Sequence, residues 1–252
     1  MECSVCQDLQ DLGHYYQVSH IIQGFGGQWY PGLVCQECKK CVAISYEMDP
    51  PQWIWVDDIL SGPDLDLQGW QQARIVTDSI QKELRSDLDD LWRHRILSGI
   101  VYNTNAPPKD EDHECQFGFP DLNVDQIHLL WIDGQARGFC SLRKNGTALG
   151  TPMNTYQMTI LDTIFIDPRV RGRGHASCQL RGLLADNHLG LSTPISNDML
   201  VTCLKALRKS PPFRERLWLV DNFGGAGERK NLWWSAVKLA KSRQLNLETI
   251  FK

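Results

Sequence analysis

The run LDTIFIDPRVRGRGHA, residues 161–176, constrains the fold more than any other part of the chain. An apolar, strand-like segment ends at Asp167, an Arg-x-x-Gly-x-Gly turn follows, and a helix-compatible sequence continues from it. Glycines let the backbone of such a turn approach a ligand, and the first amides of the helix have no intrahelical partners. The helix dipole adds a partial positive charge at the same end. The pattern predicts a phosphate-binding turn, made more cationic by Arg169, Arg171 and Arg173.

The composition is that of a globular protein. The chain has 252 residues, of which 42% are apolar and 22% charged, enough for one large domain or one domain with a small module. Its net charge of -4 argues against a general nucleic-acid binder. No apolar run reaches the roughly 20 residues that a membrane span needs. The N-terminal sequence MECSVCQDL lacks the features of a secretory signal, so we expect mostly reduced cysteines and a nuclear or cytoplasmic location.

The first half of the chain predicts short strands followed by a long helix. Asp49 and the two prolines after it form a turn signal between two apolar runs. Further along, apolar residues recur at helical spacing. We therefore expect strands over 42–48 and 53–60, a loop over 61–69, a helix over about 78–102 and an exposed loop over 103–123.

The second half predicts a meander followed by alternating helices and strands. Asp133-Gly134 and Asn145-Gly146 are strong hairpin signals. The expected elements are strands over 127–132, 136–143 and 155–166, then a helix over 174–188, a strand over 189–195, a helix over 197–209, a strand over 217–220, a helix over 229–243 and a strand over 245–251. This order predicts an α+β fold with a mixed, largely antiparallel sheet flanked by helices.

Three antiparallel strands, the Arg-x-x-Gly-x-Gly turn into a helix, and the strand, helix and strand that follow resemble the GNAT acyltransferase fold. In that fold the turn cradles the pyrophosphate of acetyl-CoA, and the pantetheine arm pairs with the preceding strand, where a bulge splays this strand from the next. The resemblance implies that acetyl-CoA or a related acyl-CoA binds here. The residues it implies for binding are Ile164, Ile166, Arg171, Gly172, Arg173, Gly174, His175, Ala176 and Asn197. For His175, the imidazole could add charge to the site, or the residue could supply only its amide.

A narrower resemblance covers about residues 42–225. WVDDI at 55–59, LDTIF at 161–165, LGLSTPIS at 189–196, Met199, Cys203 and Leu217-Trp218 are together similar to the soluble lamin-associated protein family. Members of that family look GNAT-like in the same segment, and the larger ones are associated with the nuclear lamina. This resemblance implies a nuclear setting.

Asp162 is the candidate general base for transfer of the acyl group to an amine. It alternates with Ile160, Ile164 and Ile166, so the four side chains are expected on one face of the strand. A carboxylate on a partly buried face has a raised pKa, as a general base near neutral pH requires. The alternative interpretation is that Asp162 caps a loop or pairs with an arginine.

The proton donor that the GNAT resemblance implies is missing from its expected place. Acetyltransferases of this fold commonly place a tyrosine seven residues beyond an asparagine; here Asn197 is followed by Leu204, and no tyrosine occurs after Tyr156. Two functions therefore stay open: an N-acetyltransferase with an unidentified amine acceptor, and a catalytically inactive GNAT-like module that binds a protein partner and could do so in the nucleus. Gly224 to Gly227 could form a second anion loop, although a flexible connector is the favoured interpretation.

The N-terminal segment is rich in cysteine. Cys3-x2-Cys6 and Cys35-x2-Cys38 have the spacing of tetrahedral zinc ligands, and Cys41 follows one step further. A histidine, His14 or His20, could replace Cys3 as a ligand, and the alternative to a zinc site is a set of unliganded thiols. We expect a cysteine-rich segment over 1–41 and a GNAT-like domain over 42–252.

Overall fold

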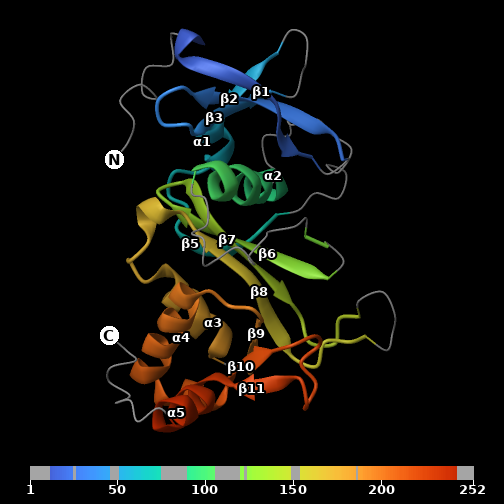
Figure 1. Cartoon of the computed structure of the whole chain (residues 1–252), viewed down its shortest axis with the longest axis vertical. Helices are drawn as coiled ribbons and strands as arrows, with labels where there is room; N and C mark the ends of the chain where they lie inside the picture. The colour runs from blue at the N-terminus through green and yellow to red at the C-terminus, as the bar shows by residue number, and fades with distance from the viewer. Residues whose placement is uncertain are drawn as a thin grey trace.

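The structure is a computed structural model that describes residues 12–24, 27–45, 51–74, 90–105, 120–121, 124–148, 154–185 and 187–242. The chain has an α+β fold with two sheets and helices packed against them (Figure 1). The first sheet has four strands in the order β1-β2-β3-β4, and the second has seven in the order β11-β10-β9-β8-β7-β6-β5. The α+β class predicted from the sequence is confirmed.

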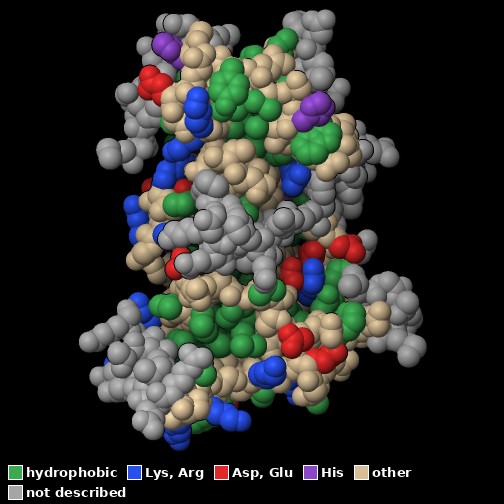
Figure 2. Space-filling view, viewed as in Figure 1, with side chains coloured by type: hydrophobic (Ala, Val, Ile, Leu, Met, Phe, Trp, Pro, Cys, Tyr) green, Lys and Arg blue, Asp and Glu red, His purple; other side chains and the backbone are tan. Residues whose placement is uncertain are grey.

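The first sheet is antiparallel throughout. A short 3-10 helix, η2 (Leu12–His14), leads into β1 (Tyr15–Gln23), β2 (Trp29–Cys35), β3 (Cys41–Ser45) and β4 (Trp53–Trp55), so the sheet takes strands from both sides of the predicted boundary after residue 41. Along β2, Val34 packs in a core shared with α2, whereas Leu33 packs in a separate cluster on the opposite face. Figure 2 shows hydrophobic side chains on the surface of this sheet, where Tyr16 and Trp29 are 42% and 48% exposed.

The strand predicted over 53–60 is only half correct. β4 ends at Trp55, and α1 (Val56–Leu60) begins at the next residue. Asp57 and Asp58 lie in the first turn of α1, where negative charge stabilises a helix N-terminus. Val56 and Leu60 are both buried because a spacing of four residues places them on one helical face.

The helix predicted over 78–102 is present in its described part. α2 (Asp90–Ile96) continues into a π-helical segment, η4 (Leu97–Asn105), while residues 75–89 lie outside the described residues. Figure 1 shows α2 between the two sheets. Ile96 and Ile100 are fully buried in a cluster that also takes side chains from both sheets.

Residues 103–105 belong to this helical segment and not to the exposed loop predicted over 103–123. The physical reason is a long-range contact: the side chain of Asn105 accepts a hydrogen bond from the Cys41 amide (3.0 Å) and donates one to the Cys41 carbonyl (3.2 Å). These bonds fix the end of η4 to β3. Most of the remaining loop, 106–119 and 122–123, lies outside the described residues.

The second sheet contains the predicted meander. Its strands are β5 (Gly69–Gln72), β6 (Asp125–Ile132), β7 (Gln135–Arg143), β8 (Thr159–Ile166), β9 (Leu189–Ser192), β10 (Leu217–Val220) and β11 (Arg229–Asn231). β5 to β8 are antiparallel, β8, β9 and β10 are parallel, and β11 is antiparallel to β10. β8 begins at Thr159 instead of 155, because Thr155 pairs with Ala148 in an isolated bridge.

Helices cover one face of this sheet (Figure 1). They are η6 (Pro168–Val170), α3 (His175–Leu184), α4 (Asn197–Lys209), η7 (Pro211–Glu215) and α5 (Leu232–Ser242). The helix predicted from 229 begins at Leu232, because the three residues before it pair with β10 as β11. The strand predicted over 245–251 lies outside the described residues, and in the described part no helix is long and apolar enough to cross a membrane.

Candidate functional site

β8 is bulged on one side and unpaired over much of its length on the other. Against β7, Thr163 pairs with Ser141 and Leu161 pairs with Leu142, so Asp162 is the extra residue of a β-bulge. Against β9, β8 pairs only through its first three residues, which end at Leu161. The two parallel strands therefore part beyond Leu161, and the bulge and the splay that the GNAT resemblance implied are both present.

The free edge of β8 in this splay includes the peptide groups of Ile164. The amide of Asp167 donates to the Arg137 carbonyl of β7 (2.8 Å), so alternation along the ladder turns the peptide groups of Ile164 and Ile166 toward the β9 side. Pairing with β9 does not reach either residue. Arg171 Nε donates to the Ile166 carbonyl (2.8 Å), which leaves the edge of Ile164 as the open one.

The glycine turn needs its glycines for backbone conformation. Gly172 and Gly174 have φ angles of 78° and 86°, in the left-handed region that favours glycine. A Cβ at either position would meet no atom within 4 Å, so the space in front of the turn is open. Gly174 is the N-cap of α3 and provides no side-chain cap for the amides of His175 and Ala176. These first amides of the helix therefore point at open space and can bind an anion.

The arginines of the turn supply less charge than the sequence predicts. Arg169 donates two hydrogen bonds to Asp167 Oδ2 (2.9 and 2.7 Å), and Arg137 lies 3.5 Å from the same oxygen. Burial acts to raise the pKa of Asp167, but the hydrogen bonds from Arg169 outweigh it and hold that pKa below its usual value. Arg171 lies over the Phe165 ring at 5.8 Å.

Arg173 is the arginine of the turn that stays available to a ligand. It is exposed and makes no ion pair or side-chain hydrogen bond with the residues that the structure describes. Asn197, which is also exposed, is the first residue of α4 and follows the cap Ser196. One unpaired cation beside a row of helix amides is a suitable arrangement for a phosphate.

His175 faces inward from the first turn of α3. Its carbonyl accepts a hydrogen bond from Trp70 Nε1 of β5 (3.0 Å), which fixes the turn to the edge of the sheet. Its Nε2 atom is buried without a hydrogen-bond partner among the described residues. A buried polar atom without a partner is costly, so a bound group that reaches this nitrogen would stabilise the site.

Asp162 is joined to a second carboxylate through one arginine. Arg143 Nη1 lies 2.8 Å from Asp162 Oδ1, and Arg143 Nε donates to Asp125 Oδ1 at 3.0 Å. Burial raises the pKa of Asp162, and the Asp125 charge raises it further, while Arg143 and a hydrogen bond with Ser192 oppose the shift. Because Ser192 ends β9, these contacts place the carboxylate at the splay between β8 and β9. Asp162 thus has the raised pKa expected of a general base, and it also has the arginine partner expected if its role is structural.

The bulge also changes which side chains of β8 lie on the same face of the sheet. Ile160 packs with Val220 in one cluster, whereas Ile164 packs with Leu161 in the cluster under α3 and α4. The extra residue at 162 shifts the alternation by one position. The prediction that Ile160, Asp162, Ile164 and Ile166 share one face is therefore wrong from Ile164 onward.

Tyr156 is a neighbour of this cluster that the sequence did not indicate. Its ring lies 5.7 Å from the Arg143 guanidinium, and it is only 2% exposed. Burial raises the pKa of the Tyr156 phenol, with Arg143 opposing the shift. Leu204, at the position where the resemblance implies a proton donor, is 3% exposed in the helix-side core. Tyr156 precedes β8 and has no local signal that could place it beside Asp162.

The structure places Cys35 and Cys38, two of the cysteines expected to bind zinc, in one cluster of the first sheet and separates Cys41 from them. Cys35 packs on one face of the first sheet and Cys41 on the other, where burial raises the pKa of its thiol to about 12. Cys38 lies in the turn after β2, and the carbonyl of His14 accepts a hydrogen bond from the amide at position 36 in that turn (3.0 Å). Cys3 and Cys6 lie outside the described residues. Within the part that is described, no three His, Cys, Asp or Glu side chains group as a metal site.

The loop from Gly224 to Gly227 already binds a carboxylate of its own. Glu228 Oε2 accepts hydrogen bonds from the Gly225 amide (3.1 Å) and the Phe223 amide (3.3 Å). These bonds hold the pKa of the exposed Glu228 below its usual value, with the Gly225 amide as the largest cause. The arrangement supports the connector interpretation, because the loop's amides are directed at its own carboxylate.

The geometry defines an α+β protein whose central strand is bulged and splayed ahead of a glycine turn. Protein FAM169B of Mus musculus is 32% identical to this chain over 224 residues, an alignment that covers 87% of this chain and 62% of the relative. The chain thus spans less than two thirds of the length of this relative. No family model and no solved structure matches the chain.

Proposed function

We propose that this chain has a GNAT-like fold, binds acetyl-CoA or a related acyl-CoA at residues 171–176, and transfers the acyl group to an amine. One observation carries the proposal: the bulge at Asp162, the splay beyond Leu161 and the glycine turn occur in sequence along one strand and its following helix. Each feature alone is common, but together they create an open strand edge that leads to an anion site. An acyl-CoA has the matching parts, an amide-containing arm and a pyrophosphate.

Binding uses backbone groups more than side chains. The amides at the start of α3 hold the pyrophosphate, and Gly172 and Gly174 allow it to approach because no Cβ occupies the space in front of them. Arg173 adds one unpaired positive charge. The pantetheine arm hydrogen-bonds to the open edge of Ile164 as an added strand would.

Asp162 is the base in the proposed transfer. The amine nitrogen attacks the thioester carbonyl, a C–N bond forms, and Asp162 accepts the amine proton directly or through one water. The C–S bond then breaks, CoA leaves as a thiolate that takes a proton from solvent, and the products are an amide and CoA. The raised pKa of Asp162 favours this role because it brings the base closer to neutral pH.

A second candidate function is a catalytically inactive module that binds a protein partner. The ion pair of Asp162 with Arg143 favours it, because a carboxylate already paired with a cation is a weaker base. The burial of Leu204 favours it as well, since no proton donor occupies that position. A location in the nucleus, as the lamin-associated resemblance implies, belongs to this second candidate.

Calorimetry with acetyl-CoA tests the binding step. We expect binding by the natural chain, at least about tenfold weaker binding by Arg173→Glu, and unchanged binding by Arg181→Glu. Arg181 is a matched control because it is exposed on the same helix near its other end. Absence of binding by any CoA ester refutes the acyl-CoA proposal.

Product formation with a panel of amines tests the chemistry. We expect transfer by the natural chain and a loss of about 100-fold or more in Asp162→Asn, with acetyl-CoA affinity retained. Acetyl-CoA binding without transfer to any amine would instead identify the inactive module. The same protein sample should be assayed for zinc, which the cysteine pairs predict.

A further inference from the structure

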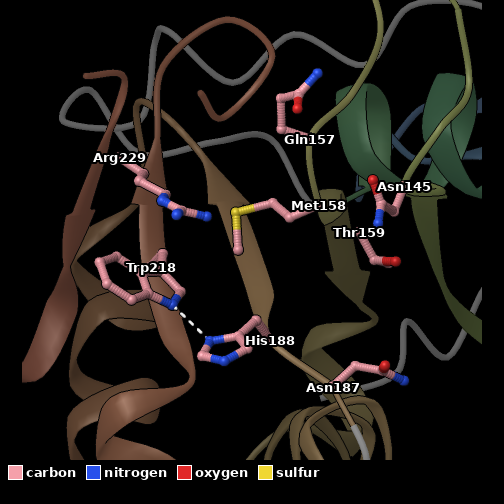
Figure 3. Close-up of a pocket in the computed structure, with 8 residues that line it drawn as sticks. All are labelled: Asn145, Gln157, Met158, Thr159, Asn187, His188, Trp218 and Arg229. Atoms are coloured by element: carbon pink, nitrogen blue, oxygen red, sulfur yellow. Dashed lines mark hydrogen bonds between the residues drawn. The ribbon is translucent and has the colours of Figure 1, made fainter. Parts of the chain in front are cut away.

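A pocket lies at the opposite end of the parallel strands from the glycine turn. It has a volume of about 310 Å³ and is lined by residues that begin β8 (Thr159) or precede β9 (His188), together with residues of β10 and β11 (Figure 3). The glycine turn is at the other end of β8. This pocket is therefore separate from the proposed acyl-CoA site, and a ligand can occupy it whether or not an acyl-CoA binds at the turn.

We propose that this pocket binds a compact carboxylate ligand with an apolar body. The central observation is Arg229, whose guanidinium lies over the Trp218 ring at 5.2 Å and extends into the pocket beside Met158 (Figure 3). Arg229 is half-buried and forms no ion pair with any residue that the structure describes. A partly desolvated cation without a counter-charge creates a preference for an anion at that place.

His188 adds a neutral donor to the same pocket. Trp218 Nε1 donates a hydrogen bond to His188 Nδ1 at 3.1 Å, as Figure 3 shows. Because Nδ1 is the acceptor, the proton of the neutral imidazole is on Nε2, which is then a hydrogen-bond donor. Arg229 and His188 together therefore offer donors and no acceptor to a ligand, which suits a carboxylate.

The walls of the pocket select the rest of the ligand. Met158 is buried in the cluster behind the pocket and Trp218 packs against that cluster, so these two side chains give the pocket an apolar wall. Asn187 and Gln157 are exposed at the rim, where their amides face water. A single planar guanidinium matches the two oxygens of a carboxylate. The described lining of the pocket has no row of free helix amides like that of the glycine turn, which disfavours a phosphate.

Methyl NMR of the full chain tests this proposal with benzoate as the probe. The chain has five methionines, so a sample labelled with ¹³C in the methionine methyl groups gives few signals, and Met158→Leu identifies the one in the pocket. We expect benzoate to shift the Met158 signal in a saturable way. Benzamide, which has the same shape without the charge, should bind at least about tenfold more weakly.

Matched variants show whether Arg229 is responsible. Arg229→Gln should weaken benzoate binding at least about tenfold, while Lys230→Gln should leave it unchanged. Lys230 is a suitable control because it is exposed on the adjacent position of β11, where the side chain points to the other face. Equal binding of benzoate and benzamide, equal effects of the two variants, or tighter binding of inorganic phosphate than of benzoate would each overturn the proposal.

A third probe distinguishes the source of the carboxylate. N-acetylphenylalanine carries a carboxylate in the form found at the C-terminus of a peptide, and its amide is the neutral control. Tighter binding of N-acetylphenylalanine than of benzoate assigns the pocket to a peptide C-terminus. Tighter binding of benzoate assigns it to a small organic acid.

Discussion

Replacement of Arg143 by methionine is expected to destabilise the protein in a strongly pH-dependent way. Arg143 is the cation shared by Asp162 and Asp125, and the three side chains are 29%, 18% and 6% exposed. Removing one partner of a buried ion pair costs about 3–5 kcal/mol, and partial exposure reduces this to about 2–3 kcal/mol near neutral pH. For a protein of this size the loss corresponds to a decrease in Tm of about 4–12 °C.

The pH dependence follows from Asp162, one of the two carboxylates that remain without their cation. The folded-state pKa of Asp162 is already raised by burial, with Arg143 opposing the rise, so removal of Arg143 raises that pKa further. A group whose pKa is raised by folding stabilises the protein at a pH below its unfolded pKa, and this stabilisation is lost as the pH rises through the folded pKa. The deficit of the variant should therefore be small near pH 4 and grow toward pH 8.

Thermal unfolding of the natural chain and of Arg143→Met, from about pH 4 to about pH 8, measures this effect. Arg143→Lys keeps the charge and should recover much of the loss. Arg181→Met, at an exposed site, should change the stability by no more than about 0.5 kcal/mol. A deficit of equal size at every pH would refute the electrostatic reasoning and leave packing as the role of Arg143.

Further outcomes are expected for substitutions elsewhere in the chain. Leu204→Tyr should lower the free energy of unfolding in urea by about 1–3 kcal/mol and create no proton donor, because the site is 3% exposed in the core. Gly138→Ala should also lower the free energy of unfolding by about 1–3 kcal/mol, because the new Cβ would lie 2.6 Å from a backbone carbonyl oxygen of β8. Gly182→Ala should instead raise the free energy of unfolding by about 0.4–1 kcal/mol, because Gly182 lies inside α3 and a Cβ there would have open space around it. If zinc binds, elemental analysis should show that Cys35→Ser lowers the zinc content while Cys41→Ser, on the opposite face of the sheet, does not.

Features encoded by neighbouring residues were predicted well from the sequence. The turn at Asp133-Gly134 joins β6 to β7 as expected, and both residues have positive φ angles, 50° and 71°. Such a turn depends on the preferences of two adjacent residues and on alternation in the strands beside it. The glycine turn at Gly172 and Gly174 was predicted for the same reason, because its backbone conformation is a property of a few consecutive residues.

Features that depend on a distant partner were missed. The residues of β11 form a strand because β10 pairs with them, and Asn231 Oδ1 then accepts a hydrogen bond from the Trp234 amide at the start of α5 (3.0 Å). The bulge at Asp162 also depends on the register of β7, so the local sequence did not indicate it, and only the GNAT resemblance implied a bulge in this strand. A strict alternation of side chains along 160–166 is what the local pattern predicts, and one extra residue changes it.

Charge was the hardest property to predict, because a sequence shows cations without their partners. The run from Asp167 to Arg173 has three arginines. Arg169 is paired with the Asp167 carboxylate, and Arg171 donates a hydrogen bond to the backbone carbonyl at the end of β8. The anion that we propose for the turn would therefore be held mainly by amides, whose directions depend on the left-handed conformations of the glycines. Near the other end of β8 the reverse holds: Arg229 looks ordinary in the sequence, yet among the described residues the fold gives it no counter-charge in its pocket. Which cations are free to bind a ligand is decided by the packing of strands that are far apart in the chain.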